Sequence, residues 1–336
     1  MPSVPPIAGS GSVGLILPTT QWAFSPGQSG STLGANKGTT NGVTDWLVET
    51  CRAAEAAGAG ALWAVDHLFW PSPMLECLTT LTVAATATRT ATLGTCVLQL
   101  PLRRPAAVAK QAAALQLLSG GRFVLGVGAG SHPGEYEMAG VDFGDRGRQM
   151  DVGIAEVRAA WASAGEPDVD YRQEPAPAPV PLWVGGSSDA ARRRAARAAD
   201  GWVPLFLGPD QFATTLGRLR DDTVAAGRPA EAVTAAVVAM VAVGGDRQVH
   251  ERGARWLSSL YRIPPKAFDR HLVAGPAERC AEEVHRFFAA GADHVVVMVA
   301  DDRAVDHFAE LVGALSPAWP GAAASPARPE LVEVPA

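Results

Sequence analysis

Cysteine is scarce in this sequence, which holds only Cys51, Cys77, Cys96 and Cys280 among its 336 residues. No two of them form a CxxC pair, and none has the spacing to histidine that zinc sites use. The sequence therefore predicts neither a metal site nor a disulfide framework. Free thiols suit a reducing compartment, and residues 1–12 lack the charged region and apolar core of a signal peptide. We expect a cytoplasmic protein.

Basic residues and long apolar runs are scarce as well. The chain has 28 Lys and Arg against 34 Asp and Glu, which gives a net charge of −6. A negative chain with no basic tract interleaved with aromatic residues is a poor candidate for nucleic-acid binding. No apolar run reaches the ~18 residues that a membrane span requires. The expected partner is therefore a small molecule, and neither nucleic acid nor a membrane.

What the sequence does hold is an alternation of short apolar runs and alanine-rich amphipathic stretches, typical of repeated βα units. Eight strands are expected, and several are continuous apolar runs of the kind buried on both faces: 13–17, 61–65, 92–98, 123–127, 182–184, 202–205, 235–243 and 295–299. Eight such strands predict an α/β fold, the (β/α)8 TIM barrel. A doubly wound open sheet is the rival, and its dinucleotide-binding version lacks a G-x-G-x-x-G after the first strand.

We expect one barrel domain over residues 1–336, with flexible tails at 1–11 and 317–336 and insertions at the C-terminal mouth. Segment 18–42 is too rich in Gly, Ser and Thr for a regular element, and segment 244–275 is the second insertion. Residues 248–290 are predicted to hold two helical stretches around Pro264-Pro265. The other expected helices are 44–57, 74–87, 105–118, 148–161, 189–198, 211–226 and 304–315.

Functional groups of such a barrel lie directly after its strands. The second strand runs into Asp66 and His67, with aromatic residues behind them. A histidine can donate or accept a proton near neutral pH, and Asp66 could orient it. Alternatively, Asp66 caps a turn and His67 is a satisfied structural partner. The position at a strand end favours the functional interpretation.

The next two strand ends hold small residues. Cys96 has no base paired with it, so packing or contact through its backbone is favoured over a nucleophilic role. The fourth strand runs into a glycine-rich loop, where small residues allow close approach of a flat or anionic ligand. Ser131, His132 and Glu135 beyond it could contact the ligand or take part in proton transfer. A tight turn with solvated polar groups is the equal alternative.

The fifth strand ends in Gly185, Gly186 and Ser187, which open a helix. Free amides and the helix dipole at such a place make an anion site, typically for phosphate. Of the arginines that follow, at most one or two could face a phosphate, and the others are expected to be solvated: Arg192, Arg193, Arg194 and Arg197. Trp202 is either barrel core or pocket wall.

Taken in order, these segments resemble the bacterial luciferase-like flavin and deazaflavin oxidoreductases. The resemblance rests on ALWAVDHLFWPS, on PLRRPAAVAKQ through SGGRFVLGVGAG, and on PLWVGGSSDAARRRAARAADGWVP, and covers most of residues 13–205. Residues 206–320 match by pattern alone. The resemblance implies a (β/α)8 barrel that binds a tricyclic ring in its mouth. The motifs look closer to the branch that uses the deazaflavin coenzyme F420 than to the luciferases.

The resemblance also implies roles for particular residues. Asp66 and His67 would lie near the reactive ring carbon, and Glu135 is added as a third catalytic candidate. A non-proline cis peptide, which commonly forms a bulge behind the ring, would fall at Cys96–Val97. The cofactor is expected to contact Gly128, Ala129, Gly130 and Ser131, with its phosphate at Gly185, Gly186 and Ser187. The residues expected at the substrate are Trp22, Trp70, His132 and Trp202.

Two departures from the branch argue against sugar-phosphate oxidation. Ser131 stands where the sugar-phosphate dehydrogenases carry a Glu, and Trp70 is one residue closer to the histidine than their Trp. The implied activity is hydride transfer between F420 and a small organic substrate, in the reducing direction at an activated C=C or C=N bond. His67 would handle the proton, assisted by Ser131, His132 or Glu135, and segment 18–42 would be a lid.

Two other activities are compatible with the resemblance. The first is an FMN-dependent monooxygenase that receives reduced flavin from a separate reductase. The second is a non-catalytic barrel that only binds a flavin or F420. A homodimer is expected in each case.

Overall fold

The computed structural model describes residues 11–20, 42–166 and 170–315. The lid expected at 18–42 falls almost wholly outside the described residues, and so do Trp22 and the tails expected at 1–11 and 317–336. Within the described ranges no helix is long and apolar enough to cross a membrane.

Eight of the described strands pair in parallel around a closed ring, which confirms the predicted (β/α)8 barrel. The last strand of the ring pairs with the first strand through Val13↔Val295 and with the seventh strand through Val237↔Val295, which closes the barrel. Each strand overlaps a predicted one, and their bounds are β1 (Ser12–Ile16), β2 (Ala61–Ala64), β3 (Thr92–Thr95), β5 (Phe123–Gly128), β6 (Leu182–Gly185), β7 (Gly201–Val203), β8 (Thr234–Val243) and β10 (His294–Val299).

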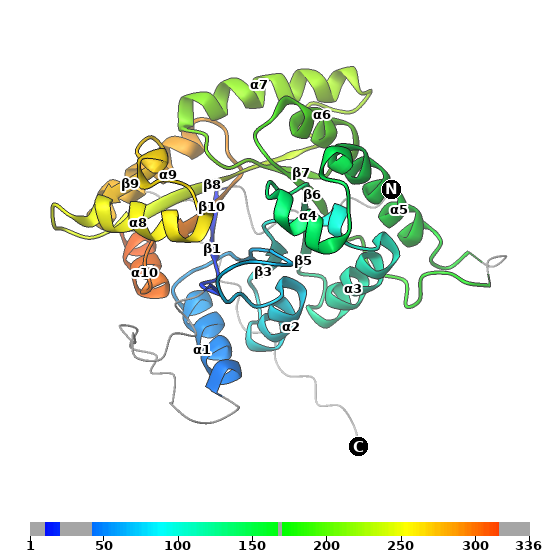
Figure 1. The fold of residues 1–336 in the computed structure, drawn as a ribbon, viewed down its shortest axis with the longest axis horizontal. Coiled ribbons are helices and arrows are strands. Elements are labelled where there is room, and N and C mark those ends of the chain that lie inside the picture. Colours follow the sequence, from blue (N-terminus) through cyan, green and yellow to red (C-terminus); the bar gives the residue numbers. More distant parts are fainter. Residues whose placement is uncertain (1–10, 21–41, 167–169, 316–336) are drawn as a thin grey trace.

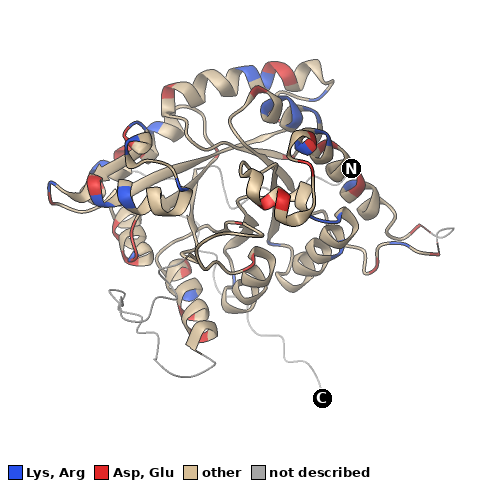
Figure 2. Cartoon of the chain, in the orientation of Figure 1, with Lys and Arg blue, Asp and Glu red and all other residues tan. Residues whose placement is uncertain are grey.

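Helices surround the barrel, as Figure 1 shows. Three of them have the predicted bounds residue for residue: α3 (Pro105–Leu118), α6 (Asp189–Ala198) and α10 (Ala304–Leu315). The others of this outer ring are α1 (Gly42–Ala56), α2 (Cys77–Ala87), α5 (Arg146–Ala162), α7 (Pro209–Ala225) and α9 (Ala277–Ala289). Charged residues lie mainly on these helices and loops, and the strands are almost free of them (Figure 2).

Several short elements were not predicted. The third strand stops at Thr95 and resumes as β4 (Leu98–Gln99), which pairs with β5. Helix α4 (Pro133–Ala139) follows the glycine loop, with proline at its first turn and left-handed Gly140 at its end. The 3-10 helices are η2 (Leu100–Leu102), η3 (Phe143–Asp145) and η4 (Pro265–Phe268).

The two helical stretches predicted within 248–290, on either side of Pro264-Pro265, are confirmed, but a strand between them was not predicted. Helix α8 (Val249–Tyr261) and α9 are separated by η4 and by β9 (Leu272–Gly275), which pairs with the last four residues of β8. A four-residue apolar run cannot be told from a helix segment by periodicity. The chain therefore has an additional strand at the mouth. Helix α8 packs its apolar side against residues of the barrel interior such as Met240 and Met298.

The barrel interior is filled by Trp63, Trp183 and His294. The two indole rings lie 5.2 Å apart, and Trp63 Nε1 donates to His294 Nε2 at 3.0 Å. Glycine is required beside Trp63, since a Cβ on Gly94 would lie 2.2 Å from that ring. Because Nε2 of His294 accepts, its Nδ1 carries the proton and donates to Ser12 Oγ at 2.7 Å. Burial lowers the pKa of His294 to about 3, so the ring is neutral.

Candidate active site

His67 and Glu135 form a close pair at the mouth of the barrel. His67 follows β2, Glu135 lies on α4, and their Nδ1 and Oε2 atoms are 2.8 Å apart. The histidine side chain is 21% exposed, whereas that of Glu135 is 3% exposed. Glu135 therefore lies behind the ring. Among the described residues, Nε2 of His67 has no hydrogen-bond partner, so it is the ring atom that remains for a ligand.

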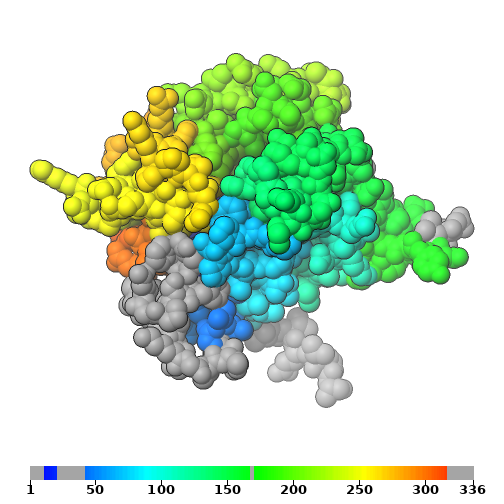
Figure 3. Space-filling view, in the orientation of Figure 1, coloured from blue at the N-terminus to red at the C-terminus, as the bar shows by residue number. Residues whose placement is uncertain are grey.

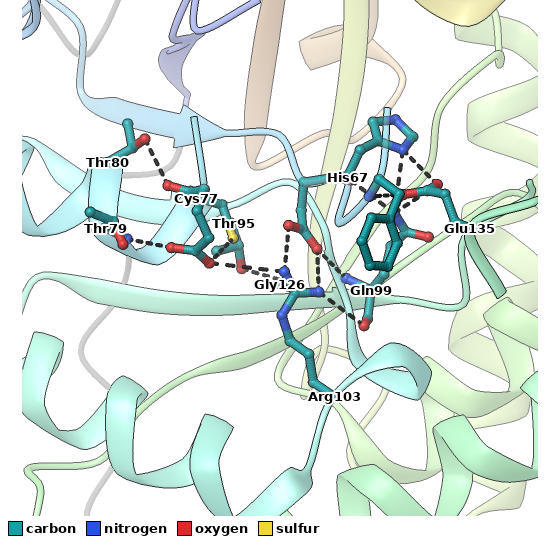
Figure 4. A network of polar contacts seen from close by, with 12 residues as sticks. His67, Cys77, Thr79, Thr80, Thr95, Gln99, Arg103, Gly126 and Glu135 are labelled. Carbon is teal, nitrogen blue, oxygen red and sulfur yellow. Dashed lines mark hydrogen bonds and ion pairs between the residues drawn. The ribbon is translucent and has the colours of Figure 1, made fainter. Parts of the chain in front are cut away.

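Glu135 is held as a carboxylate by three donors. Burial raises its pKa, but hydrogen bonds from His67, Gln99 and the Phe69 amide outweigh burial and lower it. The Gln99 amide nitrogen lies 3.2 Å from each carboxylate oxygen and 3.1 Å from the Asp66 carbonyl oxygen. Figure 4 shows His67, Gln99 and Glu135 pointing toward one another. The carboxylate thus fixes Nδ1–H of His67.

Asp66 has a different place from the one predicted. Its two carboxylate oxygens each accept a hydrogen bond from the Arg103 guanidinium at 2.7 Å. Oδ2 also accepts one from the backbone N–H of Gln99 at 2.8 Å. Asp66 is buried, and its side chain makes no described contact with the His67 ring. The structure therefore gives the role of histidine partner to Glu135, and Asp66 ties the ends of β2 and the β3–β4 segment together.

Asp66 also lies within metal-ligand distance of Glu76 and Cys77. The guanidinium of Arg103 already supplies the positive charge there, bound to Asp66 and 3.9 Å from Glu76. Burial, with Asp66 and Glu76 nearby, raises the pKa of the Cys77 thiol well above its usual range. A protonated thiol and a bound guanidinium make this cluster unsuited to a cation.

Trp70 and His132, two of the residues predicted at the substrate, lie beside His67. The Trp70 and His67 rings are stacked with centroids 3.8 Å apart, and His132 meets the Trp70 ring edge-on at 4.5 Å. Burial lowers the pKa of His132, the nearby His67 lowers it further, and Glu135 partly offsets both. His132 is therefore a neutral aromatic wall of the site.

The peptide bond between Cys96 and Val97 is cis, as the resemblance implies. The Val97 side chain packs directly against Gly128 and Gly185. A Cβ added to Gly128 would lie 2.4 Å from Val97 Cγ2, and a Cβ added to Gly185 would lie 2.8 Å from Val97 Cγ1. Both glycines are thus explained by the bulge itself, a reason that was not foreseen. Burial raises the pKa of Cys96 to about 12, which disfavours a nucleophilic thiolate.

The loop after β5 is shaped by its neighbours. Gly130 has φ +69°, and a Cβ there would be 2.0 Å from Gln99 Oε1, so glycine is required on both grounds. Tyr136 donates its hydroxyl to the carbonyl of Ala129. Ser131 is exposed at the mouth. This loop brings backbone, rather than side chains, to the edge of the site.

The loop after β6 presents the N-terminus of α6. Ser188 caps the helix by accepting from the Ala191 amide at 3.2 Å, and the Ser187 hydroxyl donates to the Leu205 carbonyl. The first-turn amides have no acceptor within the helix, which suits an anion. Asp189 stands in this first turn and is exposed, so it opposes an anion nearby.

The arginines of α6 do not face this loop as a group. Arg192 is buried and paired with Asp189 and Asp222, and Arg194 is buried and bonded to Asp151. The expectation that most of them are solvated is wrong for these two. Both tie α6 to neighbouring helices, because Asp222 lies on α7 and Asp151 on α5.

Trp202 is core and not pocket wall. It is fully buried, its ring is stacked on Phe212 of α7 at 5.8 Å, and its Nε1 donates to the Gly186 carbonyl at 2.9 Å. Its side chain therefore points out of the barrel toward the helices. The expected substrate contact is wrong, and Trp202 instead supports the loop after β6.

Half of the buried polar side-chain atoms that have no hydrogen-bond partner among the described residues belong to segments after β1, β2 and β3 or to α8. Within the described ranges these include Thr19 Oγ1, Trp70 Nε1, Gln99 Oε1 and Trp256 Nε1. Buried polar groups are normally satisfied, so a site with several unsatisfied ones suits a ligand that carries both donors and acceptors. A tricyclic ring with a polar edge has this character, and the residues present fit such a group.

The sequence model of the luciferase-like monooxygenase family matches residues 20–261 of this chain. The chain belongs to this family. The matched range contains the His67–Glu135 pair, the Cys96–Val97 bulge and the loop after β6.

Mycobacterial proteins are among the relatives in sequence. An uncharacterised protein of Mycobacterium tuberculosis is 32% identical over 209 residues, which are 52% of this chain and 70% of that protein. A phthiodiolone/phenolphthiodiolone dimycocerosates ketoreductase of Mycobacterium kansasii is 30% identical over 200 residues, 55% of this chain and 54% of that protein. The match thus spans about half of the ketoreductase.

Solved structures share the fold at low identity. An F420-dependent secondary alcohol dehydrogenase, bound to an F420–acetone adduct, has a TM-score of 0.73 at 19% identity and covers 90% of this chain and 98% of its own. The oxygenating constituent of 3,6-diketocamphane monooxygenase from Pseudomonas putida, bound to FMN, has a TM-score of 0.66 at 18% identity, covering 92% and 98%.

Sequence reasoning missed two residues of this luciferase-like site. Gln99, which directly follows the predicted strand 92–98, bonds to Glu135 and to Asp66, and Arg103 neutralises Asp66. Gln99 is a buried amide in an apolar run, and that signal could have marked it. Arg103 is one of two adjacent arginines, and no local pattern separates it from Arg104.

Proposed function

We propose that this protein is an F420-dependent oxidoreductase that reduces an activated C=C or C=N bond of a small organic substrate. The observation that carries the proposal is the His67–Glu135 pair: an imidazole at the mouth, fixed through Nδ1 by a buried carboxylate, with Nε2 left for a ligand. Such a group suits transfer of one proton beside a hydride transfer.

The cofactor would be held by three segments of the mouth. The Cys96–Val97 bulge would support the ring from the barrel side, and the loop from Gly128 to Ser131 would line it with backbone. The loop from Gly185 to Ser187, at the start of α6, would hold the phosphate. Bound there in its reduced form, F420 would supply a hydride, which is chemistry that no side chain offers.

The chain's own residues position the substrate and manage the proton. His67 donates a proton from Nε2, while Glu135 holds Nδ1–H and balances the charge of the imidazolium form. Trp70 and His132 confine the space above the imidazole. Gln99 keeps the Glu135 carboxylate in place, so it is a positioning residue.

An FMN-dependent monooxygenase is the second candidate, favoured by the family match and by the shared fold of the FMN-bound diketocamphane monooxygenase. In that case a separate reductase would supply reduced FMN, and oxygen would be consumed. We propose a homodimer in either case, which sedimentation of the purified chain would test.

A binding titration separates the candidates. Purified protein is titrated with F420 and with FMN, each followed by fluorescence, and oxygen uptake is recorded with each reduced cofactor. We expect tighter binding of F420 and no oxygen uptake. Tighter binding of FMN with oxygen uptake would establish the monooxygenase, and tight F420 binding without turnover of any activated alkene or imine would indicate a non-catalytic carrier.

A further inference from the structure

We infer that Tyr261 is a second hydrogen-bond donor of the site, which binds a carbonyl oxygen of the substrate. This inference rests on the proposed function and deepens it, because it identifies the group that activates the reduced bond. The substrate class becomes a conjugated ketone with a small apolar substituent, such as a methyl group, beside its carbonyl.

Tyr261 is the last residue of α8, the insertion helix that packs over the barrel interior. Its neighbours come from separate parts of the ring: Met298 from β10, Phe206 from the segment after β7, and Cys96 from the end of β3. Figure 3 shows the yellow surface around α8 beside the green surface around α4. Tyr261 thus lies at the end of a helix that packs over the barrel interior.

The Tyr261 hydroxyl has no strong hydrogen-bond acceptor among the described residues. Its one hydrogen-bond partner among the described residues is the Met298 sulfur, at 3.5 Å. A thioether is a weak acceptor, whereas a buried tyrosine hydroxyl normally finds a good one. Burial raises the pKa of Tyr261, and the nearby Cys96 raises it further, so the group stays a protonated donor at any ordinary pH.

The ring of Tyr261 is fixed in place by an aromatic cluster. Phe206 and Phe268 each lie 5.7 Å from it, and His271 contacts Phe206 at 5.4 Å. Phe206 adopts φ +63°, a left-handed conformation that is a genuine outlier for a bulky residue. Such outliers persist where their surroundings enforce them and gather at functional sites. The cluster therefore holds the phenol in one orientation.

A small apolar cavity shares Met298 with the surroundings of the phenol. It has a volume of about 20 Å³ and is lined by residues that include Ile16, Val65, Leu260 and Met298. Met298 thus contacts both the cavity and the Tyr261 hydroxyl. Space of this size holds one water or one methyl group, and an apolar lining favours the methyl group. A carbonyl bonded to Tyr261 could place its methyl substituent here.

The chemistry then balances around the two donors. Reduced deazaflavin would supply the hydride that forms a C–H bond at the β-carbon of the conjugated ketone, and would itself be oxidised. The C=C π bond breaks, and its electron pair becomes the enolate, whose oxygen accepts from Tyr261. A proton from His67 at the α-carbon completes the saturated ketone. Stabilising the charge that develops on oxygen is the accelerating contribution of Tyr261.

The test uses 4-phenylbut-3-en-2-one labelled with ¹³C at its carbonyl carbon. In the wild-type protein, hydrogen bonding should move the bound carbonyl resonance downfield, and Tyr261→Phe should return it toward the value in an apolar solvent. With F420 bound and reduced, Tyr261→Phe should lower kcat/KM for this ketone about ten- to hundredfold. Tyr171→Phe is the matched control, since Tyr171 is 98% exposed, and should change neither readout.

An unchanged resonance in Tyr261→Phe would overturn the inference, and so would loss of the shift in Tyr171→Phe as well. The F420 titration of the same variants keeps this failure separate from failure of the proposed function. If F420 does not bind the wild type, the proposed function fails, whereas the carbonyl shift in the cofactor-free protein still tests Tyr261. Circular dichroism of Tyr261→Phe confirms that the variant is folded.

Discussion

Two histidines of this barrel, His294 and His67, show how one residue type takes opposite roles at the two levels of the fold. His294 lies inside the barrel between Trp63 and Ser12, with both ring nitrogens bonded and a pKa near 3. His67 lies at the mouth, with one nitrogen held by a carboxylate and the other left for a ligand. Burial with neutral partners makes the first a structural residue, and an anionic partner with an open nitrogen makes the second a catalytic candidate.

The largest expected effect comes from removing the mouth histidine. In His67→Ala the rate of oxidation of reduced F420 by the conjugated ketone should fall by about 10²–10⁴-fold, the usual contribution of a general acid. Binding of F420 should be unchanged, because His67 acts on the proton and not on the cofactor. Stopped-flow absorbance measures the rate. His285→Ala on α9 is the control, and a near-normal rate in His67→Ala would remove His67 from the mechanism.

The next effect concerns the interior histidine and pH. The folded pKa of His294 is about 3, below its ordinary value of 6.5, so between these values the unfolded chain binds a proton that the folded chain does not. The stability this group contributes is present above about pH 6.5 and is lost as pH falls, by up to about 1.4 kcal/mol per unit. Urea unfolding between about pH 7 and 4.5 should therefore show a steeper loss for the wild type than for His294→Gln.

Equal slopes for the two proteins would contradict a neutral buried His294. Nuclear magnetic resonance of the wild-type ring gives a second measurement that does not depend on the variant folding. The His294 resonances should keep their neutral values down to about pH 5, well below the ordinary pKa of histidine.

The contrast between the two histidines was only partly accessible from sequence. The barrel followed from alternating apolar and amphipathic runs, and His67 from its place at a strand end. Its partner did not follow, because Glu135 is 68 residues away on a helix of seven residues that no periodicity signalled. The adjacent Asp66 was the natural choice, yet Arg103 takes its carboxylate.

The interior histidine and Trp202 show a second limit. Strands buried on both faces do not alternate, so the pattern does not say which side chain faces the barrel axis and which faces the helices. Trp183 points inward and Trp202 outward, although both lie in short apolar strands. The register of β6 with β7 pairs Trp202 with Val184, so Trp202 lies on the opposite face of the sheet from Trp183.

A third effect separates orientation from proton transfer. Glu135→Gln should lower the rate with reduced F420 about ten- to hundredfold, less than His67→Ala, because the imidazole remains but loses its anionic partner. The downfield Nδ1–H proton resonance of His67 should disappear in the variant. Glu137→Gln, an exposed neighbour on α4, is the control. A normal rate together with loss of that resonance would show that the ion pair is structural.

The smallest effect returns to the interior. Ser12→Ala removes the hydroxyl that accepts from Nδ1–H of His294. An unsatisfied buried donor costs about 1–3 kcal/mol, and we expect the low end, because the Ser12 backbone also bonds to the ring. Urea unfolding at neutral pH measures the loss, with exposed Ser131→Ala as the control. Catalysis should be unaffected, since Ser12 contacts the neutral histidine and not the mouth. If Ser12→Ala changed the rate with reduced F420 but not the free energy of unfolding, His294 would not be a purely structural residue.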